Sequence, residues 1–149
     1  MSIRASIERE LQYGATDETN ILRRWAALTR LLAGAERFVK GAEYDPYDFF
    51  VFGSKGLPFG TVDTKRRRVP VGQYGDVMVP LSKHEFALRL PQMTSVLVTE
   101  YGCGTLVELD LRLEPNEVRN ISRRDRPGMK PVPHAIYLLD QAEVLEAPE

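Results

Sequence analysis

The sequence predicts an α+β fold in which an N-terminal antiparallel helical hairpin packs on a small, mostly antiparallel β-sheet or open barrel of about five strands. Apolar residues recur at helical spacing within residues 1–41, and short apolar runs separated by glycine and proline follow them. Segments with helical periodicity therefore precede segments with strand character. This order excludes a doubly wound parallel sheet, in which helices and strands alternate.

The longest helical pattern covers residues 17–40. Asp17 is the predicted N-cap, and Lys40 with Gly41 provides a cationic last turn and a left-handed stop. Trp25, the only tryptophan, would bury more apolar surface on this helix than any other residue. The side chains of the predicted buried face recur at steps of three and four: Ile21, Trp25, Leu28, Leu32, Ala35, Phe38 and Val39.

A shorter helix is predicted over residues 2–13, where Ile3, Ile7 and Leu11 are spaced by four. Only residues 14–16 separate it from the longer helix. A connection this short predicts that the two helices fold back on each other as an antiparallel hairpin.

A β-rich body is predicted over residues 47–146, with no further helix. Glycine, proline and β-branched or aromatic runs define its strands. A glycine loop at 53–60 and a long basic loop at 114–133 connect some of them. The predicted strands are residues 49–52, 69–71, 76–79, a hairpin within 95–113, and a closing strand from 135–139 and 144–145.

The strongest β pattern lies in the hairpin. Apolar residues from Val107 to Leu113 alternate with Glu108 and Asp110, so we expect one dry face and one solvated face. The glycines on either side of Cys103 predict the turn.

Length and composition predict a single domain of 149 residues, 1–149, of ordinary globular character. The net charge of −1 provides no global attraction to nucleic acid or anionic lipid. We find no secretion signal and no apolar run near the ~20 residues of a membrane span. One cysteine and two histidines argue against a disulfide or zinc site. We therefore expect a cytoplasmic, other intracellular or virion location, no membrane contact, no metal and no cofactor.

Two basic segments are the candidate anion-binding or nucleic-acid-binding residues. Together they would make a patch suited to phosphates if the sheet brings them together. Phe59 and Tyr74 are candidates for stacking on bases. The alternative is that both segments are solvated loops or bind a partner's carboxylates. The candidate cations are Lys55, Lys65, Arg66, Arg67, Arg68, Arg119, Arg123, Arg124, Arg126 and Lys130.

The segment Phe52-Gly53-Ser54 with Asp63 resembles the opening of the minimal nucleotidyltransferase motif. In that family a glycine-serine pair follows a strand, and two carboxylates one residue apart hold the metal. The resemblance covers little more than a dozen residues, and Lys65 stands where the second carboxylate belongs. A tight glycine turn after a buried strand explains the same residues.

Two other groups of residues have types used in catalysis. Glu108 and Asp110 share a strand face and would suit Mg²⁺ or acid–base chemistry, although charged residues on a solvated face are usually there for solubility. Cys103 has no histidine close in sequence, but His84 or His134 could meet it in space. None of these groups forms a complete catalytic constellation.

Three functions follow from these observations. The first is a non-catalytic interaction or assembly protein, a subunit of a larger macromolecular or virion-like complex, with a protein partner or a second copy of itself. The second is nucleic-acid binding through residues 65–68 and 119–130. The third is a small enzyme acting on a phosphate-bearing substrate near residues 53–63. A non-enzymatic role ranks above an enzymatic one.

Overall fold

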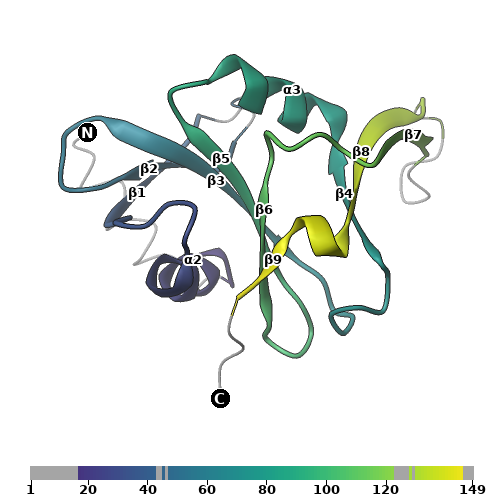
Figure 1. The fold of residues 1–149 in the computed structure, drawn as a ribbon, viewed down its shortest axis with the longest axis horizontal. Coiled ribbons are helices and arrows are strands. Elements are labelled where there is room, and N and C mark those ends of the chain that lie inside the picture. The colour runs from purple at the N-terminus through teal and green to yellow at the C-terminus, as the bar shows by residue number, and fades with distance from the viewer. Residues whose placement is uncertain (1–16, 43–44, 46, 123–127, 129, 146–149) are drawn as a thin grey trace.

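The architecture of this chain is mostly β and not a helical hairpin on a five-stranded sheet. A computed structural model describes residues 17–42, 45, 47–122, 128 and 130–145, and these residues form nine strands, two α-helices and a short 3-10 helix (Figure 1). The predicted first helix at 2–13, and with it the hairpin partner, lies outside the described residues. The helices are α2 (Asp17–Leu28) and α3 (Leu81–Arg89), and the 3-10 helix is η1 (Leu139–Gln141).

The strands form two sheets. The larger sheet has six strands in the order β1 (Arg37–Lys40), β2 (Phe49–Phe52), β3 (Pro58–Arg66), β5 (Thr94–Glu100), β6 (Leu106–Asp110) and β9 (Glu143–Val144). The smaller sheet has three strands in the order β4 (Asp76–Pro80), β8 (Val132–Leu138) and β7 (Glu117–Ile121).

All strand pairs among the described residues are antiparallel except β3 and β5 at the centre of the larger sheet. Their parallel register runs from Gly60 opposite Thr94 to Arg66 opposite Glu100. A parallel pair needs a crossover connection, and β4 followed by α3 provides it. This crossover carries the chain from the larger sheet to the smaller one and back, which explains why the sheet is mixed.

Both faces of the larger sheet are covered, so the molecule has two cores. On one face α2 packs Trp25 and Ile21 against Val96 and Val98. On the other face α3 and the smaller sheet pack against residues that include Leu97 (Figure 1). Because β5 is buried on both sides, its middle residues Val96, Leu97 and Val98 form a continuous apolar run instead of an alternation.

The long helix predicted over 17–40 is wrong beyond Leu28. The Thr29 amide donates to the Trp25 carbonyl at 2.7 Å, and the Thr29 hydroxyl accepts from the Leu32 amide at 3.2 Å, so the chain closes a turn. Gly34 then adopts a φ of +92°, which only glycine reaches readily, and the chain continues into β1. No helix therefore reaches the cationic end predicted at Lys40 and Gly41.

The prediction of no helix after residue 41 is also wrong, because α3 lies at 81–89. Its inward side carries Lys83 and His84, and Ala87 is its only buried residue. The polar residues at inward positions hide the apolar period that normally marks a helix.

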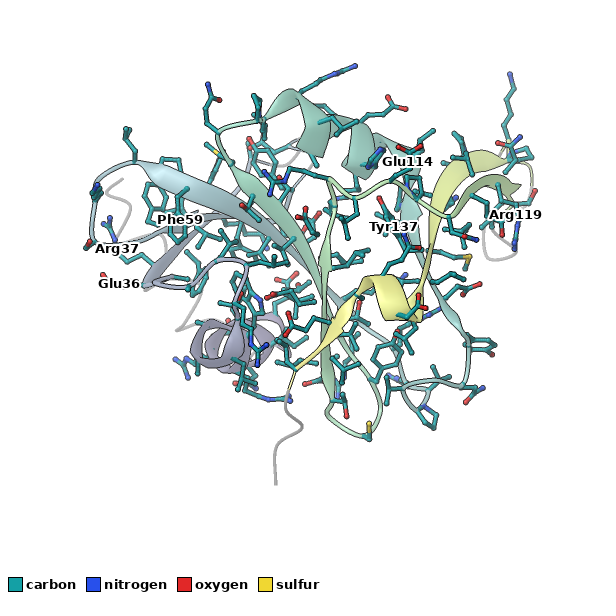
Figure 2. The ribbon with its side chains drawn as sticks, viewed as in Figure 1. Glu36, Arg37, Phe59, Glu114, Arg119 and Tyr137 are labelled. Carbon is teal, nitrogen blue, oxygen red and sulfur yellow. The ribbon has the colours of Figure 1, made fainter. Side chains whose placement is uncertain are left out.

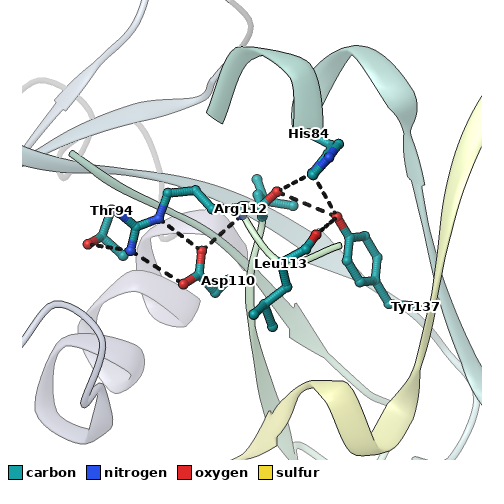
Figure 3. Close-up of polar contacts among 7 residues, drawn as sticks. His84, Thr94, Asp110, Arg112, Leu113 and Tyr137 are labelled. Carbon is teal, nitrogen blue, oxygen red and sulfur yellow. Dashed lines mark hydrogen bonds and ion pairs between the residues drawn. The ribbon is translucent and has the colours of Figure 1, made fainter. Parts of the chain in front are cut away.

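The contacts of α3 explain why polar residues are tolerated there. His84 Nδ1 lies 2.7 Å from the Leu111 carbonyl oxygen, and because that oxygen can only accept, Nδ1 carries the proton (Figure 3). The Tyr137 hydroxyl lies 3.2 Å from the same nitrogen and donates to the Leu113 carbonyl at 3.0 Å. This network ties α3 and β8 to the chain just after β6.

Several strand and loop predictions need correction. The loop at 53–60 is shorter, because β3 begins at Pro58 and continues to Arg66. Residues 69–71 are not a strand, and the loop at 114–133 contains β7. The strand at 49–52, the strand in β4 and the hairpin of β5 and β6 with Cys103 in an exposed turn are confirmed. No helix in the described residues is long and apolar enough to cross a membrane.

The predicted solvated face of the hairpin is wrong at Glu108, which is 1 % exposed. Its carboxylate accepts a hydrogen bond from the Trp25 indole and another from the Leu31 amide at 3.3 Å. The alternation in β6 therefore separates two covered faces, and α2 covers the one that we expected to be wet.

Candidate nucleic-acid interface

The parallel pairing of β3 and β5 brings the ends of both strands together beside an open cleft. Arg66 and Glu100 lie opposite each other in register, and the Arg67 amide donates to the Glu100 carbonyl at 2.8 Å. The cleft has a volume of about 550 Å³. We call it the arginine cleft, and it is lined by Arg66, Arg67, Arg68, Glu100, Tyr101, Gly102, Cys103 and Gly104.

Glycine at position 102 allows the two walls of the cleft to approach each other. The Gly102 amide donates to the Val69 carbonyl at 2.9 Å. A Cβ at this position would lie 2.9 Å from the Arg68 carbonyl oxygen, closer than real Cβ contacts. The turn between β5 and β6 therefore holds residues 67–69 by backbone contacts that a side chain would disrupt.

Among the described residues that line the arginine cleft, Glu100 is the acidic one. Its carboxylate accepts from Arg24 Nη1 of α2 through one oxygen, and its other oxygen lies 3.2 Å from Arg66 Nε. Arg24 also donates to the Gly104 carbonyl. In the described part of the chain, three lining arginines and Arg24 thus face a single carboxylate. These described residues give the cleft an excess of positive charge on a protein of net charge −1.

An aromatic ring stands beside these cations. The Arg67 guanidinium lies 5.6 Å from the centroid of the Tyr74 ring, and Tyr74 is 50 % exposed. A cation over a ring at this distance is attracted by its π face. One of the two predicted stacking residues is therefore placed next to the cleft.

The exposed thiol of Cys103 lines the same cleft. Its Sγ lies 3.0 Å from the Thr105 hydroxyl, and hydrogen bonds, first of all with Thr105, lower the pKa of the thiol. The histidines considered as its partners interact elsewhere. His84 Nδ1 lies against the Leu111 carbonyl, and His134 Nδ1 lies 2.8 Å from the Val132 carbonyl oxygen. The described contacts show no Cys–His pair.

The other predicted cations do not all join the cleft. Lys65 Nζ approaches the Met78 carbonyl oxygen at 3.5 Å. Lys55 and Phe59 line a different cleft of about 550 Å³, formed by the glycine loop between β2 and β3. Phe59 is partly buried there against the first core.

The described part of the second basic segment lies away from the arginine cleft. Arg119 sits on β7 opposite His134, which in turn lies opposite Pro80, at the end of β4 remote from the cleft (Figure 2). Lys130 is exposed near the start of β8. The remaining predicted members, Arg123, Arg124 and Arg126, lie outside the described residues.

The residues that resemble a nucleotidyltransferase motif do not form a site. Ser54 lies in the turn of the β2–β3 hairpin, whereas the Asp63 carboxylate accepts from the Asp48 amide at 2.6 Å, at the opposite end of the hairpin. Lys83 of α3 forms an ion pair with Asp63 at 3.1 Å. Burial, with a smaller contribution from Asp48, raises the pKa of Asp63 to about 6, and Lys83 acts against this rise.

The predicted pair of carboxylates, Glu108 and Asp110, does not form a site either. Glu108 is enclosed under α2, and Asp110 instead holds the side chain and amide of Arg112 (Figure 3). In the described parts of the chain, no three His, Cys, Asp or Glu side chains gather in a way that could hold a metal ion. Comparison with protein-family models, curated proteins and solved structures finds no significant match for this chain.

Proposed function

We propose that this protein binds single-stranded nucleic acid in the arginine cleft and does so without catalysis. The observation that supports this function is the convergence of Arg66, Arg67 and Arg68 on one open cleft, with the exposed ring of Tyr74 against Arg67. Guanidinium groups bind phosphates through paired hydrogen bonds, and an aromatic face stacks on bases. A partner offering only carboxylates would use the arginines but not the ring.

The test is a titration with labelled single- and double-stranded oligonucleotides over a range of salt concentrations. Three phosphate contacts predict that log affinity falls with log salt with a slope of about −2 for a single strand. The triple alanine variant at positions 66, 67 and 68 should bind about tenfold or more weakly at low salt and lose most of that slope. Tyr74→Ala should weaken binding without changing the slope, because the ring carries no charge.

A matched control distinguishes binding in the arginine cleft from a general effect of removing positive charge. The variant Arg37→Ala/Arg89→Ala/Arg112→Ala removes the same charge from parts of the surface outside the arginine cleft and outside β7, and should keep the wild-type affinity and slope. Wild-type protein that binds no oligonucleotide at low salt, or equal losses in the two triple variants, would contradict the proposal. Stronger binding of double-stranded than of single-stranded oligonucleotide would contradict its single-strand part.

The second candidate function is that of a non-catalytic subunit of a larger assembly. It is supported by β7, an edge strand of the smaller sheet in which four of five residues are exposed. An edge strand carries outward backbone donors and acceptors that can pair with another chain. Chemical crosslinking of the purified protein over a concentration series tests this function.

A further inference from the structure

The smaller sheet ends at β7, and four of the five residues of this strand are exposed to solvent. Among the described residues β7 pairs with β8 alone. Val118, the second residue of the strand, is 54 % exposed. Glu117 and Arg119 form an ion pair on the surface, with side chains 44 % and 53 % exposed.

The face on which each side chain lies follows from the register with β8. Val118 lies opposite Ala135, which belongs to the second core, so Val118 lies on the inner face of the sheet. Its neighbours Glu117 and Arg119 therefore lie together on the outer face.

A second copy can extend this sheet about a two-fold axis perpendicular to it. Such an axis makes the two strands antiparallel and passes through a pair formed by one residue and its own copy. If the axis passes through Glu117 or through Arg119, a charge faces its own copy. If it passes through Val118, each Glu117 faces an Arg119 on the outer face and the two valines meet on the inner face.

We propose that two copies of this chain pair β7 to β7 in antiparallel orientation, centred on Val118, and so join two three-stranded sheets into one of six strands. The charge pattern and the exposed valine favour this register independently of each other. The intrachain ion pair between Glu117 and Arg119 does not oppose it strongly, because an exposed pair contributes little to stability. The proposal rests on the second candidate function and not on the arginine cleft.

Sedimentation velocity over a concentration series measures the self-association of wild type and two charge reversals. Glu117→Arg places arginine against arginine across the axis, and Arg119→Glu places glutamate against glutamate. We expect each reversal to move the midpoint of dimerisation to about tenfold higher concentration or more, because facing like charges repel. A mixture of the two reversed proteins should restore association, since each supplies the charges that the other lacks.

The variant Glu36→Arg is the matched control, because Glu36 is exposed and lies at the opposite end of the molecule from Arg119 (Figure 2). It should dimerise as wild type does. Recovery in the mixture also shows that the reversed proteins fold. A wild type that stays monomeric at millimolar concentration, reversals that leave dimerisation unchanged, or a mixture that does not recover would each overturn the proposal.

The same variants distinguish this proposal from nucleic-acid binding. With an oligonucleotide too short to reach both clefts of a dimer, the charge reversals on β7 should leave affinity within about twofold of wild type, because they lie away from the arginine cleft. Alanines at positions 66, 67 and 68 should leave dimerisation unchanged for the same reason. Failure of one proposal therefore leaves the other standing.

Discussion

At the scale of single residues, the buried carboxylate of Glu108 explains how α2 is fixed to the larger sheet. The Trp25 indole and the Leu31 amide both donate to it, and Trp25 is fully buried. A buried donor that loses its acceptor keeps its desolvation cost. Trp25 was predicted as a core residue from its helical spacing, but β6 alternation by itself gave no sign that Glu108 lies beneath it.

We expect Glu108→Ala to lower the free energy of unfolding by about 2–5 kcal/mol, because two donors and a small cavity remain. Glu108→Gln keeps one acceptor and should lower it by about half as much. Urea denaturation followed by Trp25 fluorescence measures both. Asp110→Ala on the same strand is the control and should cost under about 1 kcal/mol, because Asp110 holds only the exposed Arg112. Equal costs at positions 108 and 110 would contradict this account.

The raised pKa of Asp63 predicts how the stability of the folded protein depends on pH. The unfolded chain ionises Asp63 near pH 4, whereas the folded protein keeps the proton until about pH 6. Over this interval the folded state binds more protons, so stability falls as pH rises, and it levels off above the folded pKa. The contribution of Asp63 is therefore fully present in acid and lost at neutral pH.

Asp63→Asn cannot ionise and removes this dependence. We expect the stability of wild type relative to the variant to fall by about 2–3 kcal/mol between pH 4 and pH 7. Denaturant unfolding of both proteins across this range gives the difference, in which the other carboxylates cancel. A difference that is constant, or that rises with pH, would show that Asp63 is not held in the neutral form.

At the scale of elements, the helix predicted over residues 17–40 was too long for an identifiable physical reason. Leu32, Ala35 and Phe38 continue the helical spacing beyond Leu28, yet they reach the same core as α2 through a turn and a strand. Spacing along the chain cannot separate these two routes to one core. Thr29 and Gly34 were the local signals of the break, but the apolar pattern outweighed them.

Strands were easier to predict where turn-forming residues flank them in the sequence. The β5–β6 hairpin followed from the glycines around Cys103, and Phe49–Phe52 from aromatic density. The parallel pairing of β3 with β5 had no signal in the sequence, because it depends on the crossover through α3. The arginine cleft depends on that pairing, so only its arginines and the neighbouring Tyr74 were predicted as binding residues. Glu100, which lines the cleft, and Arg24, which pairs with Glu100, were missed.

A substitution at Gly60 tests how tightly the turn after α2 packs on β3. A Cβ at Gly60 would lie 2.4 Å from Leu32 Cδ2 and 2.8 Å from the Thr94 carbonyl oxygen of the neighbouring strand. We expect Gly60→Ala to lower the free energy of unfolding by about 1–3 kcal/mol, because the backbone oxygen cannot move aside. Gly56→Ala is the control, since nothing lies within 4 Å of its added Cβ. Thermal unfolding of the two variants measures the difference, and equal midpoints would contradict this packing.

At the scale of the whole molecule, the two proposed contacts lie at separate places on one scaffold. The central parallel pair shapes the arginine cleft, and the smaller sheet presents β7. A dimer through β7 would carry two arginine clefts, and linked sites raise the apparent affinity for a strand long enough to reach both. The net charge of −1 does not predict this arrangement, because the positive charge is concentrated at the arginine cleft.

The most direct test of nucleic-acid binding uses Cys103, the only cysteine, which is exposed in the arginine cleft. A small trifluoromethyl tag on this thiol reports its surroundings by fluorine NMR during titration with a single-stranded oligonucleotide. We predict a saturable shift that weakens as salt rises and disappears when Arg66, Arg67 and Arg68 are replaced by alanine. A fluorine signal that stays unchanged while the oligonucleotide binds would place binding outside the arginine cleft and contradict the proposed function.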